Sequence, residues 1–235
     1  MKIFKTFTKF EWVLWITSMS VVTGSFLIGK CAGLLTLIAS LTGVTALIFV
    51  AKGNVTGQVL TVIFSLLYAV ISYSQSYYGE MITYLGMTAP IAVMSVVTWL
   101  RHPFDNDKSE VKVAVMTKKQ TLFMLVLAAL VTFVFYFILR YFNTAKLAIS
   151  VVSITTSFIA SYLTMMRSPF YALAYSANDI VLVIMWTLSS LNDVSYLPMA
   201  ICFAMFWTND IYGFYNWKRI HKRQLNGEQK YTERC

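Results

Sequence analysis

Eight stretches of this chain are apolar and long enough to cross a lipid bilayer. Hydrophobic residues make up 58% of the 235 residues and charged residues only 12%, whereas a soluble domain is roughly half apolar and about a quarter charged. A bilayer is crossed by about 17 to 25 consecutive apolar residues. The sequence therefore predicts an all-α, polytopic membrane protein with eight transmembrane helices, near residues 11–29, 31–51, 55–74, 79–99, 120–140, 146–165, 170–190 and 196–216.

Two regions of the chain share one pattern of hydrophobic spans. Residues 32–100 and 147–218 each contain three spans, and each region closes on a Trp-x-Arg motif. A shift of 115 residues aligns the basic residues Lys52 and Arg167, and a shift of 118 aligns the two Trp-x-Arg motifs. We interpret the regions as parallel three-helix repeats. Such repeats are an architecture of transporters that hold a substrate near the membrane midplane.

The connection between the repeats contains a long polar interruption and one further span. A three-helix unit ends on the opposite side of the membrane from where it began, so one more crossing must precede a second unit of the same orientation. The predicted order is one helix, three helices, one linking helix and three helices (1+3+1+3). The segments are an N-terminal helix 1–30, a first repeat 31–100, a loop and linking helix 101–145, a second repeat 146–218 and a basic tail 219–235.

The basic residues fall almost entirely on one side of the predicted membrane. With eight spans both termini share a side, and 16 of the 19 Lys and Arg residues lie on it; Lys30, Arg140 and Lys146 lie on the other. The positive-inside rule places the basic side in the cytoplasm. We therefore expect a multi-pass protein of the cytoplasmic (inner) membrane with both termini inside. The net charge of the chain is +9. We expect the basic residues that produce this charge to contact the lipid bilayer rather than nucleic acid.

Three of the predicted spans carry a stripe of polar or aromatic residues at steps of three and four. Such a stripe marks one helix face turned toward protein or water. Hydroxyl groups in these stripes more often pack between helices than bind a ligand. The stripes are Gln58, Thr61, Ser65, Tyr68, Ser72 and Gln75; Tyr171, Tyr175, Asn178, Leu182, Trp186 and Ser189; Cys202, Met205, Asn209, Tyr212 and Asn216; and, less regularly, Glu80, Tyr84, Thr88 and Ser95 in a fourth span.

The amides and carboxylates within the spans are the strongest candidates for a binding site. Asn178, Asp179, Asn209 and Asp210 are costly in a bilayer unless they are paired or hydrated, and ionisable groups there are functional candidates. The two aspartates are equally explained as structural partners of each other or of tyrosine hydroxyls. Trp186, near the middle of its span, offers a flat ring on which an aromatic ligand with a polar edge can stack.

The sequence offers no residues for catalysis, for a cofactor or for a metal. His102 and His221 lie in predicted cytoplasmic segments, and Cys31, Cys202 and Cys235 show no pairing or metal spacing. There is no phosphate-binding loop and no nucleophile elbow. We therefore expect a protein that is not an enzyme and that has no cofactor and no metal site.

The end of the second repeat resembles a known family. Its sequence from Phe206, Phe-Trp-Thr-Asn-Asp-Ile-Tyr-Gly-Phe-Tyr-Asn-Trp-Lys-Arg, contains the pattern N-x-x-Y-G-x-x-x-W. It follows Asn178-Asp179 in the second repeat, and Tyr78-Gly-Glu and Pro90 in the first. With these residues the chain resembles the PnuC-type vitamin transporters over about residues 31–220.

This resemblance implies a function and an assembly. It implies import of nicotinamide riboside by facilitated diffusion through a 3+1+3 fold related to the SWEET sugar transporters. It also implies a homotrimer and a cytoplasmic kinase that phosphorylates the substrate and so draws import forward. Many members have Asn where this chain has Ile63 or Phe64, and Gln where it has Tyr84.

Stripes and resemblance together define an expected substrate site. Two alternatives stay open: a thiamine or riboflavin transporter of the same fold, and a non-transporting membrane scaffold or receptor, which a sealed core around Trp186 would favour. The expected set is Trp186 and Tyr84 against the ring, Asn178 and Asn209 on the carboxamide or ribose, Tyr68 and Tyr212 as gates, with Thr88 and Asp179 beside them.

Overall fold

The described chain is a bundle of helices. The computed structural model describes residues 7–29, 33–74, 78–104, 110–144 and 146–232. Within these ranges the strand-like structure is a single bridge between Pro103 and Val111. The helices are α1 (Lys9–Gly29), α2 (Leu34–Ala51), α3 (Val55–Ser74), α4 (Tyr78–Thr83), the π-helix η2 (Tyr84–Thr88), α5 (Ala89–Arg101), α6 (Lys118–Tyr141), α7 (Leu147–Met165), α8 (Tyr171–Ser190), the 3-10 helix η3 (Val194–Tyr196) and α9 (Leu197–Thr232).

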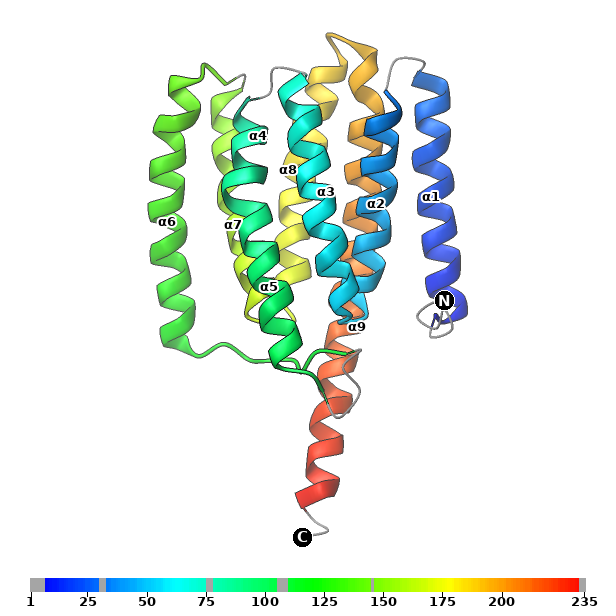
Figure 1. The fold of residues 1–235 in the computed structure, drawn as a ribbon, viewed down its shortest axis with the longest axis vertical. Helices are drawn as coiled ribbons and strands as arrows, with labels where there is room; N and C mark the ends of the chain where they lie inside the picture. The colour runs from blue at the N-terminus through cyan, green and yellow to red at the C-terminus, as the bar shows by residue number, and fades with distance from the viewer. Residues whose placement is uncertain (1–6, 30–32, 75–77, 105–109, 145, 233–235) are drawn as a thin grey trace.

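Seven candidate membrane spans occur in the described part of the chain, with α4 to α5 counted as one. This confirms a helical, multi-pass membrane protein. The first half of α9 runs beside the other helices (Figure 1). However, it is less apolar than they are, because it carries Thr208, Asn209 and Asp210.

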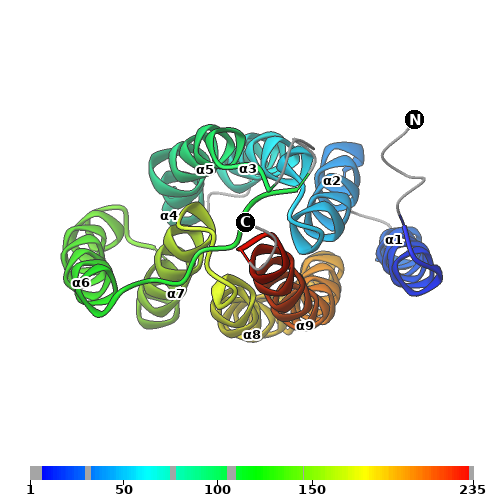
Figure 2. The ribbon, with the colours of Figure 1, turned by 90° about the horizontal axis from the view of Figure 1, so that it is seen from below.

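The helices form two layers, with α2, α3 and α5 in one and α7, α8 and α9 in the other (Figure 2). Helix α2 packs against α9 and α5 packs against α7, so the layers meet at both edges. Helix α1 packs outside the α2–α9 edge, and α6 packs outside α7 at the opposite edge. The start of α1, the end of α9 and the α5–α6 connection all lie at one end of the bundle (Figure 1), which we call the terminal end.

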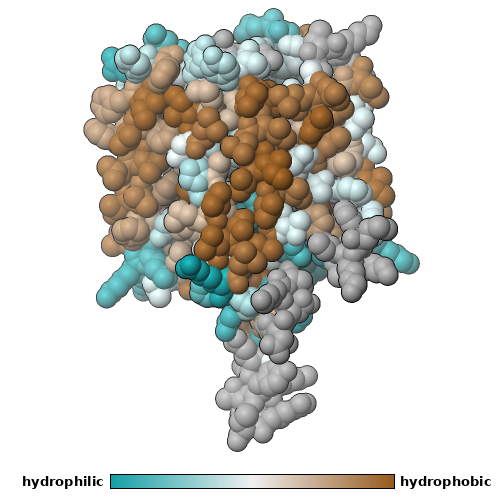
Figure 3. All heavy atoms as spheres, viewed as in Figure 1, coloured by the Kyte–Doolittle hydropathy of each residue, from teal (hydrophilic) through white to brown (hydrophobic). Residues whose placement is uncertain are grey.

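On the face seen in Figure 3, apolar residues form a belt that is bounded by polar residues at both ends. Helix α6 illustrates why the chain needs a membrane, because most of its large apolar side chains have no covering element. A surface of this kind is stable against lipid tails and not against water. The exposed side chains of α6 include Leu122, Phe123, Leu125, Val126, Leu130, Phe133 and Phe137.

One π-helical turn interrupts the span between α4 and α5. The amide of Ala89 donates to the carbonyl of Tyr84, five residues earlier, and Pro90 has no N–H with which to continue the ladder. A π turn inserts one residue into a helix and is frequent at functional sites. Here both ends of the turn face the interior, since Tyr84 is 7% and Thr88 is 6% exposed.

Helices α2 and α7 end in the same local geometry. Gly53 (φ 67°) and Arg167 (φ 59°) both have left-handed backbone conformations. The next residue, Asn54 or Ser168, accepts a hydrogen bond from the amide two positions later. Equivalent positions are therefore 114 residues apart here. The predicted shift of 115, which paired Lys52 with Arg167, is wrong by one residue because it matched side-chain charge and not backbone geometry.

The tryptophans that close the two repeats contact each other. The ring centroids of Trp99 and Trp217 are 5.5 Å apart, and both side chains are fully buried. The Trp99 indole donates to the carbonyl of Thr164 in α7 at 2.9 Å. The Trp217 indole donates to the carbonyl of Val50 in α2 at 2.8 Å. Because Val50 and Thr164 are also 114 residues apart, each tryptophan bonds the equivalent carbonyl of the opposite layer.

A short segment after α5 crosses the terminal end and bonds both layers. The amide of Val111 donates to the carbonyl of Gly53 at 2.9 Å, and the amide of Ala114 donates to the carbonyl of Arg167 at 3.0 Å. The segment thus uses the same two left-handed positions that end α2 and α7. In its described part, the predicted polar loop between the repeats is therefore ordered. We call its residues 111–114, which bond both layers, the brace.

Helix α9 continues through most of the predicted basic tail, as far as Thr232. The prediction ended the last span at residue 216 because polarity rises there. The helix persists because Trp217, Ile220 and Gln224 form a buried face. The Gln224 side chain donates to the Val111 carbonyl and accepts from the Val113 amide, which fixes the helix to the brace.

The crossed tryptophans lead to a stability prediction. Trp217→Phe keeps an aromatic ring but removes the N–H that bonds the Val50 carbonyl. We expect the free energy of unfolding to fall by about 1 to 3 kcal/mol, the cost of losing a buried hydrogen bond, measured by thermal denaturation in detergent. Trp207→Phe is the matched control, because Trp207 is 40% exposed. Equal shifts for the two variants would contradict the proposed role of Trp217.

Candidate functional site

A narrow cavity of about 70 Å³ lies between the two layers. Four of the eight predicted site residues line it: Tyr84, Thr88, Asn178 and Asp179. Six aromatic residues and seven other polar residues make up most of the wall, and four aliphatic or small residues complete it. The full lining is Gly43, Ala46, Leu47, Val50, Gln58, Thr61, Phe64, Tyr84, Thr88, Ser157, Tyr171, Tyr175, Asn178, Asp179, Phe203, Phe206 and Asp210.

Hydroxyl groups of α7 orient the amide of Asn178. Its Oδ1 accepts hydrogen bonds from Thr156 Oγ1 at 2.8 Å and from Ser153 Oγ at 3.4 Å, and the residue is 4% exposed. Since α7 occupies the carbonyl oxygen, the NH2 group is what this amide offers to a ligand. A carbonyl or hydroxyl oxygen is the matching ligand group.

Two carboxyl groups meet at the cavity wall. Asp179 of α8 and Asp210 of α9 are 4% and 3% exposed, and their side chains make a hydrogen bond with each other. Such a bond requires a proton, because two ionised carboxylates this close would repel each other. The two residues are thus partners of each other, which was one predicted alternative, and both also line the cavity.

An aromatic cluster covers one side of the cavity. The Tyr84 ring centroid is 4.3 Å from that of Tyr68 and 6.0 Å from that of Phe64, and Phe206 is 5.6 Å from Phe64. Tyr68 is 1% exposed and lies behind these rings rather than in the lining. The predicted gate residue Tyr68 is therefore a second layer of the wall in this conformation.

Trp186, predicted to stack on a ligand, does not line this cavity. It is 3% exposed and packs on Tyr196 with ring centroids 5.7 Å apart. Eight residues along α8, about 12 Å, separate it from Asn178. The core around Trp186 is closed. Taken alone, a closed core at this residue would favour the alternative of a non-transporting scaffold or receptor. The cavity lies further along the same helix.

The predicted stripe on α9 faces α1 and α2 and not the cavity. Asn209 donates to Ser18 Oγ of α1 at 3.0 Å, and Tyr212 donates to Glu11 Oε1 of α1 at 2.9 Å. The structure therefore does not bring Asn209 or Tyr212 together with the other predicted residues. The neighbouring Asp210 enters the cavity instead, because adjacent helical positions point about 100° apart.

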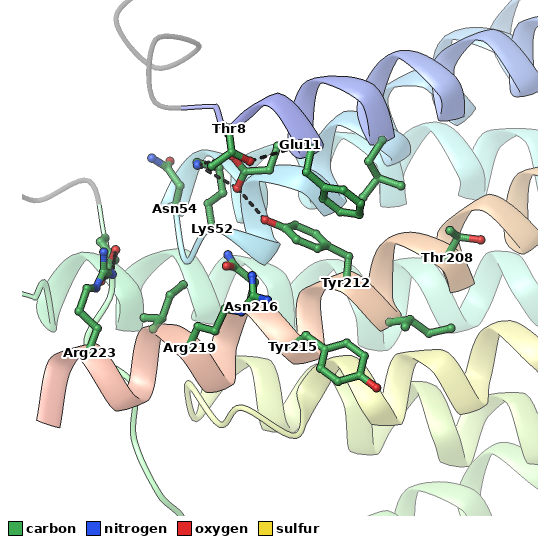
Figure 4. A pocket seen from close by; sticks show the side chains of 15 residues that line it. Thr8, Glu11, Lys52, Asn54, Thr208, Tyr212, Tyr215, Asn216, Arg219 and Arg223 are labelled. Carbon is green, nitrogen blue, oxygen red and sulfur yellow. Dashed lines mark hydrogen bonds and ion pairs between the residues drawn. The ribbon is translucent and has the colours of Figure 1, made fainter. Parts of the chain in front are cut away.

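A wider groove of about 820 Å³ lies between α1 and α9 at the terminal end (Figure 4). At its edge Glu11, 2% exposed, accepts hydrogen bonds from Lys52 Nζ at 3.0 Å, from the Tyr212 hydroxyl and from the amide of Thr8. Lys52 follows α2 and Tyr212 belongs to α9, so this cluster connects α1 to both layers. The polar groups of this cluster bond one another. The hydroxyl of Tyr212, which was predicted as a gate, is one of them and bonds Glu11.

Several residues of the cavity were missing from the expected set. Gln58, Thr61, Tyr171 and Tyr175 belong to the predicted stripes, and the 3–4 spacing was the signal that could have selected them. The phenylalanines of the wall gave no signal, because an aromatic residue in an apolar span is equally suited to lipid, to the core or to a binding site.

Known proteins resemble this chain over most of its length. A family model described as nicotinamide mononucleotide transporter matches residues 33–219. A nicotinamide riboside transporter PnuC of Neisseria mucosa is 26% identical over 190 residues, which cover 79% of this chain and 72% of the relative. One of Haemophilus influenzae is 20% identical over 190 residues, covering 80% and 81%. A crystal structure of the vitamin B3 transporter PnuC has the same fold, with a TM-score of 0.80, 24% identity and coverage of 93% and 94%.

The Glu11–Lys52 ion pair leads to a test of whether this contact stabilises the packing of α1 against α2. Glu11→Gln and Lys52→Met each leave a poorly hydrated charge without its partner, so each should lower the free energy of unfolding by about 3 kcal/mol. The double variant should be more stable than either single variant, since it leaves no unpaired charge. Thermal denaturation of the four proteins gives the coupling energy. Additive losses would mean that the two side chains act independently.

Proposed function

Because this chain belongs to the nicotinamide mononucleotide transporter family, we propose that it carries nicotinamide riboside across the cell membrane by facilitated diffusion. The chain is a membrane transporter of the PnuC kind. The observation that supports the substrate best is the cavity between the layers, whose aromatic rings and oriented Asn178 amide suit a flat ring that bears a carboxamide. This argues against a scaffold or receptor.

The proposed membrane arrangement is eight crossings in the order 1+3+1+3. Support comes from packing: α1 packs on α2 and α9, while α6 packs on α7 and α4, so each outer helix lies at one of the two edges where the layers meet. We place the terminal end in the cytoplasm because 16 of 19 basic residues belong to that side. The family resemblance further implies a homotrimer, a SWEET-like fold and a cytoplasmic kinase that traps the substrate.

The proposed transport cycle requires the two layers to separate. Binding cavities for small molecules usually measure about 300 to 1,000 Å³, so a cavity of about 70 Å³ corresponds to a closed conformation. On one side it is closed by the Tyr68–Tyr84 cluster, with Trp186 beyond it. On the terminal side lies the Trp99–Trp217 contact. Opening one closure at a time would expose Asn178 to each side in turn.

A related vitamin is the second candidate for this chain. Tyr84 and Phe64 line the cavity. The resemblance implies a Gln in many members at the position of Tyr84, and an Asn at the position of Ile63 or Phe64. The site is therefore less polar and more aromatic than the resemblance implies, which suits the second ring of thiamine or the fused rings of riboflavin. A binding panel of the three vitamins on purified protein separates these substrates.

A passive carrier can only equilibrate its substrate. In proteoliposomes held at zero membrane potential, without kinase or ion gradients, labelled nicotinamide riboside should enter until the two concentrations match. The potential must be zero because it adds about 2.3 kcal/mol per 100 mV for a charge of +1. Accumulation of the substrate well above the external level under an imposed proton or sodium gradient would show ion coupling and refute uniport.

The two predicted amides provide a matched pair of substitutions. Asn178→Ala should weaken nicotinamide riboside binding by roughly tenfold to a hundredfold, because it removes a buried donor whose partner on the ligand is then unsatisfied. Asn209→Ala should leave the dissociation constant within about threefold, because that side chain bonds Ser18. Calorimetry on detergent-purified variants measures both. The reverse order of effects would move the site to the α1 side of α9.

A further inference from the structure

The wall of the central cavity carries acidic groups without basic ones. Asp179 and Asp210 both line it, and among the described lining residues none is Lys, Arg or His. The ion pair of Lys52 with Glu11 lies in the groove between α1 and α9 and not in the cavity. A ligand in the cavity therefore meets carboxyl groups whose charge no side chain in the lining neutralises.

The pair carries one negative charge when it holds one proton. Burial of a carboxylate with no positive partner is costly, and a second ionised carboxylate beside it would add repulsion. A single shared proton relieves the repulsion and forms the hydrogen bond between the two side chains. A cationic ligand supplies the positive partner that the wall lacks, and so favours the form of the pair with one proton and one negative charge.

A buried oxygen atom in the same wall has no hydrogen-bond partner in the described part of the chain. It is the hydroxyl oxygen of Thr88, a residue that is more than nine-tenths buried and lies in the π-helical turn on the layer opposite the two acids. Buried polar atoms without partners are rare in proteins, and this one belongs to the lining of the cavity. It is independent evidence that the cavity takes a ligand.

Aromatic rings complete a site suited to positive charge. Tyr84, Tyr175, Phe64 and Phe206 line the cavity together with the two acids. The face of an aromatic ring attracts a cation, and the attraction grows when the cation is desolvated. A delocalised ring cation gains from these faces and from the carboxylate, whereas a neutral ring gains only from stacking.

We propose that the Asp179–Asp210 pair, holding a single proton, is the counter-charge that recognises the positive ring of a pyridinium nucleoside. This inference rests on the proposed function and adds its specificity: the transporter selects cationic ligands over neutral ligands of the same shape. Thiamine, whose thiazolium ring is also a cation, satisfies the same rule. Riboflavin, which is uncharged, does not.

The test compares two ligands that differ in ring charge. Nicotinamide riboside has a cationic ring, and its 1,4-dihydro form has nearly the same shape and no charge. Calorimetry on the full-length protein in detergent should give a dissociation constant at least about tenfold lower for the cation. This comparison uses the wild-type protein, so it needs no variant to fold. Equal affinities would overturn the inference.

Substitutions then assign the preference to the pair. Asp179→Asn and Asp210→Asn should each keep the preference within about threefold, because the new amide donates the hydrogen bond that the shared proton made and leaves one charge. The double variant D179N/D210N should bring the ratio of the two dissociation constants close to one. Glu80→Gln is the matched control, since Glu80 is a 5% exposed acid that does not line the cavity.

The outcomes separate the inference from the proposed function. A wild-type protein that binds neither ligand would overturn both. Binding of the cation with a preference that the double variant retains would overturn the inference and leave nicotinamide riboside transport standing. Loss of the preference in the double variant, with the dihydro form still bound, supports the counter-charge.

Discussion

The crossed hydrogen bonds of Trp99 and Trp217 connect the two layers of this transporter. Each indole donates to a backbone carbonyl near the end of the opposite layer's first helix, and the two rings pack against each other. Carbonyl groups near a helix end have incomplete partners within the helix. Here each carbonyl already accepts a bond from a turn amide, that of Gly53 or of Arg167. The two indole bonds therefore satisfy the buried indole N–H groups, and they hold the layers together at this end.

With the layers fixed at one end, the polar faces of α3 and α8 and the Asp210 side chain of α9 meet in the middle of the bundle. Polar groups there avoid lipid, and the residues that find no protein partner surround a cavity. The unpartnered hydroxyl of Thr88 on one layer and the Asp179–Asp210 pair on the other mark this place. The proposed cycle uses the same geometry, since a substrate that bonds both layers stabilises a closed conformation, and its release requires the layers to part.

Much of the fold follows from simple features of the sequence. The spans are predictable because length and apolarity suffice, and the buried stripe of α3 from Gln58 to Ser72 is predictable because its period matches a helix. Gln75, the last member of that stripe, lies outside the described residues, as do Cys31 and Cys235. The π turn at Tyr84 and the continuation of α9 past residue 216 depend on tertiary contacts that no local pattern contains.

The site was harder to predict than the fold, for a reason visible on α9. A polar stripe shows that a face avoids lipid, but it does not distinguish a substrate from another helix. Asn209 and Tyr212 face α1, while Asp210 faces the cavity. On α8 the predicted Asn178 and Asp179 do reach the cavity, whereas Trp186 lies further along the same face. Adjacent positions thus have different partners.

A structure of the protein with nicotinamide riboside bound tests the central claim most directly. The account predicts that the ligand lies between the layers, with its carboxamide at Asn178, its ring against Tyr84 and the Asp179–Asp210 pair beside it, in a cavity larger than the present one. A ligand found in the groove between α1 and α9, or outside the two layers, would contradict it.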